Sequence, residues 1–216
     1  MGMKTKNAAA PLLKDVAYQQ IKEQILDESF APGSFLSERE LIEVLQMSKT
    51  PIKSALVRLE TEGFVTVSSK QGIIINPLSI DQIMDIYNLR IALESYILNQ
   101  ISGKLTEEQC CLIEKNLADT ELKCDQLDIK GFTNEDHAFH LLLCEFSGNR
   151  EIYRVLLNYQ DHLHRITLRH LKKDPHRMHK FHQEHIEIYK SLKSGDDQAV
   201  ELITNHLQKS KQKLLD

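Results

Sequence analysis

The sequence predicts a mainly α-helical fold, with a small N-terminal domain of short helices and a β-hairpin, followed by an all-α bundle of six helices. Two differences between the halves of this 216-residue chain support the prediction. The first 78 residues alternate short periodic segments with proline and glycine turns, whereas long helical patterns without strand signals fill the remainder. All ten histidines also lie between His137 and His206. We therefore expect a flexible tail over residues 1–13, one domain over 14–78 and a second over 79–216.

The N-terminal domain is expected to contain three helices. Near-helical spacing of apolar residues predicts the first over residues 14–28. The second should begin after Ser37, because Ser37 can cap it and Glu40, three residues on, completes a capping box. The third should begin near Pro51, since proline is tolerated in the first helical turn. Gly63 is expected to end it.

Two β-branched runs follow these helices, over residues 64–67 and 73–75, and flank a polar segment at 69–72. This pattern is typical of a β-hairpin. Two short helices joined by a tight turn and followed by a hairpin make a winged helix-turn-helix. The predicted fold is therefore an N-terminal winged helix-turn-helix and a C-terminal six-helix bundle.

The second helix of such a motif enters the major groove of DNA. Lys49 and Lys53 lie four residues apart at its N-terminal end, opposite the apolar stripe, and neighbouring hydroxyls can bond phosphates or base edges. The formal net charge of −4 excludes a non-specific nucleic-acid coat but allows a local DNA-binding face. The alternative is a set of solvated charges around an ordinary α+β domain. The expected DNA-contacting residues are Arg39, Ser48, Lys49, Thr50, Lys53, Lys70, Gln71 and Gly72.

The C-terminal half is expected to be a helical bundle with an ordinary globular core, since 41% of the chain is hydrophobic. No apolar run approaches the ~20 residues of a membrane helix, and residues 1–11 lack the apolar region of a secretory signal. The four cysteines form no CxxC pair, and we expect buried, reduced thiols in a cytoplasmic protein. The expected helices span roughly 80–103, 106–127, 130–147, 149–171, 175–194 and 196–214.

Four residues of the bundle form a candidate metal site. Asp136 and His140 lie four apart on one helix face, while His185 and His206 lie on two further helices. Three helices of a bundle can direct these groups to one interior point. One carboxylate with three imidazoles suits a divalent transition metal, with zinc preferred and nickel or manganese possible. The alternative for any single histidine is a surface or hydrogen-bonded residue. We expect His176, His179 and His182 to lie on a solvated face, and His137 and His164 not to be ligands.

Four ordered segments of the N-terminal half carry a family resemblance: Pro32–Leu41, Ser48–Leu56, Leu59–Glu60 and Glu62–Val65. On these residues the N-terminal half resembles the GntR family of bacterial repressors. The resemblance implies DNA contacts by Arg39, Lys49, Thr50, Lys53 and Gly72. Family members usually carry arginine where this chain has Lys49 and Lys53. Because arginine binds guanine bidentately and lysine less rigidly, the preferred operator is expected to differ from the family norm.

A second set of segments lies in the C-terminal half: Leu89–Arg90, Leu93–Glu94, Asp136–His140, Ser147–Asn149, Glu184–Ile186, Ser194–Asp196 and His206–Leu207. On these residues it resembles the FCD domain of the FadR branch of that family, and six helices fit its VanR-like subgroup. The resemblance implies that the four candidate ligands hold a metal and that a small carboxylate effector binds beside it. Arg90 matches the family's effector-binding arginine, and Arg165 is a weaker candidate for the same cavity. The alternative for Arg90 is a salt bridge with Glu94, four residues on.

Together these features predict a dimeric, ligand-responsive transcription regulator, most often a repressor in this family, that binds a palindromic operator. No Ser/His/Asp nucleophile arrangement accompanies the metal ligands, so we expect no enzymatic activity. Two alternatives stay open at this point: a metal-dependent hydrolase with an accessory domain, and an interaction adaptor with a structural metal.

Overall fold

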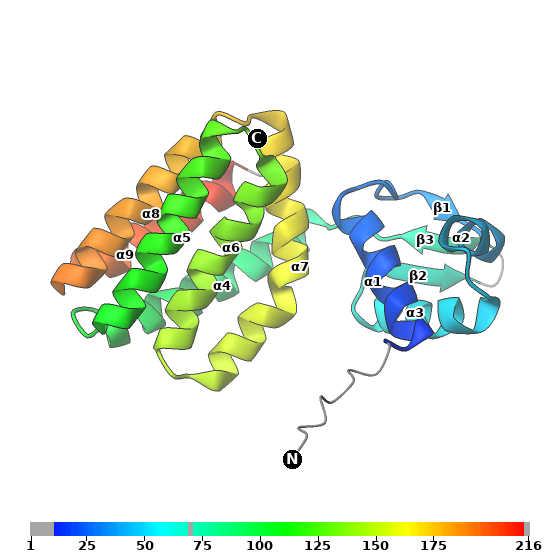
Figure 1. Cartoon of the computed structure of the whole chain (residues 1–216), viewed down its shortest axis with the longest axis horizontal. Coiled ribbons are helices and arrows are strands. Elements are labelled where there is room, and N and C mark those ends of the chain that lie inside the picture. Colours follow the sequence, from blue (N-terminus) through cyan, green and yellow to red (C-terminus); the bar gives the residue numbers. More distant parts are fainter. Residues whose placement is uncertain (1–10, 69–70, 214–216) are drawn as a thin grey trace, which may run out of the picture. The chain divides into compact units, whose positions relative to one another are not determined.

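A computed structural model describes residues 11–68 and 71–213 of the chain. The chain divides into two compact units between Leu78 and Ser79. The first six elements lie in the N-terminal unit (Figure 1), and they are α1 (Leu13–Leu26), β1 (Phe35–Leu36), α2 (Glu38–Leu45), α3 (Lys49–Thr61), β2 (Val65–Ser68) and β3 (Gly72–Ile75). The expected tail over residues 1–13 falls largely outside the described residues.

The N-terminal unit is a winged helix-turn-helix, as predicted. The expected capping box begins α2: the Ser37 hydroxyl accepts from the Glu40 amide, and the Glu40 carboxylate accepts from the Ser37 amide. Gln46 then adopts a left-handed conformation that ends α2 and turns the chain toward α3. Helices α1 and α3 pack together, and the core beneath them includes the fully buried Ile52 and Phe64.

The wing is an antiparallel sheet in the order β1-β3-β2. The two-residue strand β1 was not predicted. It pairs with β3, so that Leu36 faces Ile73 in register. Gly72, at φ +86°, begins β3, and a Cβ there would lie 2.7 Å from the Leu36 carbonyl oxygen. The missing side chain at Gly72 therefore allows β3 to approach β1 closely, and the expected DNA contact of this residue stays a prediction.

Over its described residues, 79–213, the C-terminal unit consists of six helices, as predicted, and they run alongside one another (Figure 1). Helix α4 packs on α9, α6 lies between α5 and α7, and α8 contacts both α5 and α9. None of the helices in the described residues has the length and apolar character that a bilayer crossing requires. The helices are α4 (Ile80–Ile101), α5 (Glu107–Asp125), α6 (Ile129–Phe146), α7 (Arg150–Lys173), α8 (Arg177–Ser194) and α9 (Gln198–Gln212).

Two glycines join the ends of α4 and α8. Gly103 and Gly195 both have positive φ, and a Cβ on either would lie 3.0–3.1 Å from the Cα of the other. The Gly103 amide also donates to the Leu192 carbonyl oxygen at 2.9 Å. The two helix ends therefore meet backbone to backbone.

All four cysteines are free thiols, and three of them are buried. Cys111 is exposed, contrary to the expectation of a buried side chain, because it lies on the solvent face of α5 next to the inward-facing Cys110.

Candidate functional site

Four buried side chains converge inside the C-terminal unit: Asp136 and His140 from α6, His185 from α8 and His206 from α9. Each offers one possible ligand atom, and these atoms all lie within 4.8 Å of one another. They are the four residues that the sequence analysis selected. The i, i+4 spacing places Asp136 and His140 on one face of α6, and the neighbouring helices α8 and α9 bring the other two imidazoles to that face.

The geometry of the cluster fits a metal ion. The Nε2 atoms of His185 and His206 lie 3.3 Å apart, and His185 Nε2 is 3.6 Å from Asp136 Oδ1. Two nitrogens bound to one zinc at about 2.0–2.1 Å with a tetrahedral angle would be separated by about 3.3 Å. Phe139 stacks on the His185 ring at 4.2 Å, which holds the ring plane.

His140 supplies a second argument for the fit. Its Nε2 atom is buried and has no hydrogen-bond partner, an arrangement that is costly in a protein interior unless a ligand or ion completes it. Its Nδ1 atom faces the Glu94 carboxylate at 2.5 Å. A carboxylate there favours a proton on Nδ1, which leaves the Nε2 lone pair directed at the cluster.

The Glu184 carboxylate lies 2.8 Å from His206 Nδ1 and favours a proton on that atom, as Glu94 does for His140. The sequence analysis named Glu94 only as an ion-pair partner of Arg90 and gave Glu184 no role. The position of Glu184 directly before His185 was the one available signal. Such outer carboxylates orient imidazole ligands and increase their basicity.

Burial disfavours the protonated form of two imidazoles in the cluster. It lowers the pKa of His140, and it lowers that of His185 well below the usual value, with the neighbouring imidazoles contributing. Both are therefore neutral at physiological pH, the form that binds metals. Burial alone would raise the pKa of Glu94, but Arg90 and His140 outweigh it and lower this pKa to about 2.

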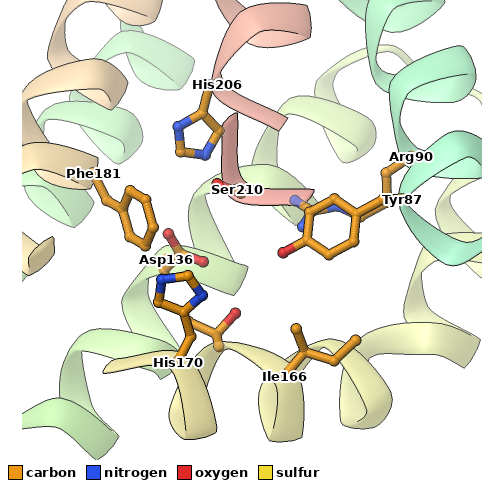
Figure 2. A pocket seen from close by; sticks show the side chains of 9 residues that line it. Tyr87, Arg90, Asp136, Ile166, His170, Phe181, His206 and Ser210 are labelled. Atoms are coloured by element: carbon orange, nitrogen blue, oxygen red, sulfur yellow. The ribbon is translucent and has the colours of Figure 1, made fainter. Parts of the chain in front are cut away.

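A small cavity adjoins the cluster. Figure 2 shows Arg90 and Tyr87 on one side of it and Asp136 and His206 on the other. Arg90 is buried and its Nε atom donates to Glu94 Oε1 at 2.7 Å, so the expected salt bridge and the cavity position occur together. The lining residues are Tyr87, Arg90, Asp136, Ile166, Thr167, His170, Phe181, His206 and Ser210.

Arg90 also lines a second cavity, together with Glu94, His137 and His140. Arg165, the weaker effector candidate, is buried on α7 but lines neither cavity. Its helical neighbours Ile166 and Thr167 face the first cavity in its place.

The remaining histidines divide into two groups. His176 and His179 are exposed, as expected, but His182 is buried because it lies on the inner face of α8 with Phe181. His137 is also buried, with its Nε2 atom 3.3 Å from the Thr167 hydroxyl, and does not belong to the four-residue cluster. His164 packs near the His137 ring at 5.9 Å.

The proposed DNA-contacting side chains lie on the surface of the N-terminal unit. Ser48 caps α3 without a side-chain hydrogen bond, and Lys49, Thr50 and Lys53 are exposed on its first turns. Arg39 is exposed and pairs with Glu43 at 2.9 Å, and Gln71 is exposed at the start of β3. Lys70 lies outside the described residues.

Glu38 is a residue of this surface that the sequence analysis missed. Its carboxylate lies 2.7 Å from Lys49 Nζ and 3.7 Å from Lys53 Nζ, so one acid faces both lysines. The lysines lower the pKa of Glu38, chiefly through the Lys49 hydrogen bond. The lysine pair therefore already contacts one anionic group.

Comparison with known protein families gives two matches. Residues 13–75 match the family described as bacterial regulatory proteins, gntR family, and residues 85–209 match the FCD domain. These ranges correspond to the helix-turn-helix unit and the helical bundle.

Individual relatives agree with these matches. The chain is 28% identical over 183 residues to the HTH-type transcriptional regulator YdhC of Bacillus subtilis, covering 84% of this chain and 81% of the relative. It is 25% identical to the HTH-type transcriptional repressor RspR of Escherichia coli, covering 94% and 88%. Among solved structures, a GntR regulator of Rhodococcus sp. RHA1 shares the fold at a TM-score of 0.79 and 20% identity, covering 94% and 97%. The E. coli protein McbR/YncC also shares the fold, at a TM-score of 0.78 and 19% identity, covering 95% of this chain and 98% of that protein.

Proposed function

The chain belongs to the gntR family of bacterial regulatory proteins and carries an FCD domain, and on that premise we propose that it is a repressor whose operator binding is modulated by a small carboxylate metabolite bound beside a metal ion. That it is a transcription regulator rather than an enzyme follows from its relatives. The observation that carries the proposal is the cavity that places the Arg90 guanidinium opposite two candidate metal ligands.

The cavity suits a small anion for two reasons. A buried arginine is costly unless an anionic partner satisfies it, and Glu94 contacts the Arg90 guanidinium through its Nε atom. A metal held by Asp136, His140, His185 and His206 would supply a second positive centre across the cavity, which would hold a carboxylate from its other end. Zinc is the metal we propose, with nickel and manganese as alternatives, since imidazole and carboxylate donors accept all three.

Operator binding is proposed for the exposed face of α3 and the wing. Lys49, Thr50 and Lys53 are exposed at the α3 N-terminus, the end that reaches base edges in helix-turn-helix proteins. Two such units in a homodimer would bind the half-sites of a palindrome in the cytoplasm, where the DNA lies.

The test combines metal analysis with DNA binding. Protein purified without a metal-affinity tag would be analysed for bound metals, and its affinity for DNA upstream of its own gene measured by fluorescence anisotropy with a panel of small carboxylates. We expect about one transition metal per chain and one class of carboxylate that changes DNA affinity several-fold, with allosteric coupling of about 1–3 kcal/mol. Stoichiometric metal with no effect of any carboxylate would favour a purely structural metal instead. An absence of DNA binding would refute the operator assignment.

A further inference from the structure

The two oxygens of Glu94 face two different parts of the candidate effector site. Oε1 accepts from Arg90 Nε at 2.7 Å, and Oε2 lies 2.5 Å from His140 Nδ1. The side chains of Arg90 and Glu94 are only 6% and 2% exposed, so water does not screen these contacts. Helix α4 contributes none of the four candidate ligands, yet through Glu94 it contacts one of them.

Glu184 provides a comparison within the same cluster. It contacts His206 Nδ1 as Glu94 contacts His140 Nδ1, but its other oxygen faces Lys209 at 3.5 Å. The Lys209 side chain is 58% exposed, so water can replace it at little cost. Both glutamates can orient an imidazole, but only Glu94 connects that imidazole to a buried cation that lines the cavity.

We propose that Glu94 is a positioning residue that makes metal affinity at His140 depend on the engagement of Arg90, so that metal and anionic effector bind cooperatively. This inference rests on the proposed function. Arg90 neutralises much of the Glu94 charge while the two are paired. When an anion in the cavity attracts the guanidinium, Glu94 becomes a stronger acceptor for the His140 Nδ1 proton, and Nε2 becomes a better metal donor. Linkage then requires that bound metal strengthens anion binding by the same factor.

The test is a double-mutant cycle that uses Zn²⁺ alone and so needs no identified effector. Zinc affinity of the full chain would be measured by competition with a chromogenic chelator for wild type, Arg90→Met, Glu94→Gln and the double variant. The control cycle replaces Glu94→Gln with Glu184→Gln. Loss of either outer carboxylate is expected to weaken zinc binding about 10- to 100-fold.

The decisive comparison is the effect of Arg90→Met in each background. We expect Arg90→Met to tighten zinc binding about threefold or more in wild type and in Glu184→Gln. In Glu94→Gln we expect almost no effect, because the carboxylate that connects residue 90 to His140 is then absent. A purely structural role for Glu94 would weaken zinc binding without removing its dependence on residue 90.

Three results would overturn the inference. The first is an equal effect of Arg90→Met in all backgrounds, which would indicate that the Arg90 charge acts directly on the metal. The others are no effect of Arg90→Met in wild type, and unchanged zinc affinity in Glu94→Gln. Circular dichroism would verify folding, and Arg90→Gln, which also removes the charge but keeps a polar side chain, would replace Arg90→Met in the same cycle if that variant does not fold. A wild-type chain that binds no transition metal would remove the metal from the proposed function and this inference with it. Zinc binding with an additive cycle would refute the inference alone.

Discussion

Glu38→Gln is expected to strengthen DNA binding, although it removes two ion pairs. In the free protein the Glu38 carboxylate contacts Lys49 and Lys53, and phosphate must displace it or approach alongside it. The side chains involved are 33–60% exposed, so the ion pairs contribute only about 0–1 kcal/mol to folding stability. Regaining up to about 1 kcal/mol on binding would correspond to about a fivefold gain in affinity for each chain that contacts DNA.

The salt dependence provides an independent readout. Removing one negative charge from the contact surface raises the number of DNA charges that the chain neutralises by about one, so the slope of log K against log[salt] should steepen by about 0.9 per chain. Lys49→Ala should do the reverse, weakening binding and making the slope shallower by about one.

Fluorescence anisotropy between about 50 and 200 mM salt would measure both quantities. The matched control is Asp119→Asn, which breaks an exposed pair with Lys115 of similar length, 2.8 Å, on α5 in the other unit, and should leave DNA binding unchanged. If Glu38→Gln left both affinity and slope at wild-type values, the lysine pair would not be the phosphate-contacting surface.

Three further variants test other parts of the structure. Gly72→Ala should destabilise the N-terminal unit in urea denaturation by more than Gly33→Ala. Both have positive φ, which costs about 1–2 kcal/mol for alanine, but only the first would place a Cβ against the Leu36 oxygen, and equal losses would contradict that clash. His206→Ala should abolish zinc binding in mass-spectrometric metal analysis; retention of one zinc per chain would exclude the four-residue site. Burial lowers the pKa of His170 to about 4, so the folded state binds fewer protons than the unfolded state between pH 4 and about 6.5. The contribution of His170 to the free energy of unfolding should therefore be fully present above pH 6.5 and be lost as the pH falls toward 4. The free energy of unfolding of His170→Gln should fall less steeply over this range. Identical pH profiles for the two proteins would show that His170 is not shielded from protonation.

Local signals were sufficient to predict the fold. The Ser37–Glu40 capping box, the glycine after α3 and the β-branched runs of the wing each depend on residues close in sequence, and each occurs as predicted. Strand β1 was missed because two residues carry no periodicity, and its pairing depends on a partner almost forty residues away.

The candidate site residues could be predicted from the sequence only where their spacing along one helix places them on the same face. Asp136 and His140 share a face of α6 by their spacing, whereas the Glu94–His140 contact joins residues 46 positions apart and has no local signature. The same holds for Glu38, which reaches from α2 to the lysines of α3. Arg165 is buried on α7 but lines neither of the two cavities described here, so its place in an effector site stays a prediction.

The contact between Gly103 and Gly195 limits how the bundle can change shape. Because the backbones touch there with no room for a Cβ, α4 cannot slide along α8 at that end without losing the contact. A rearrangement of α4, which carries Arg90 and Glu94, is then a pivot about its C-terminal end, and its displacement grows toward Ser79, where the helix begins. A rotation of α4 about the glycine contact would move Ser79 farther than Arg90 or Glu94, because Ser79 lies farther from that contact along the helix.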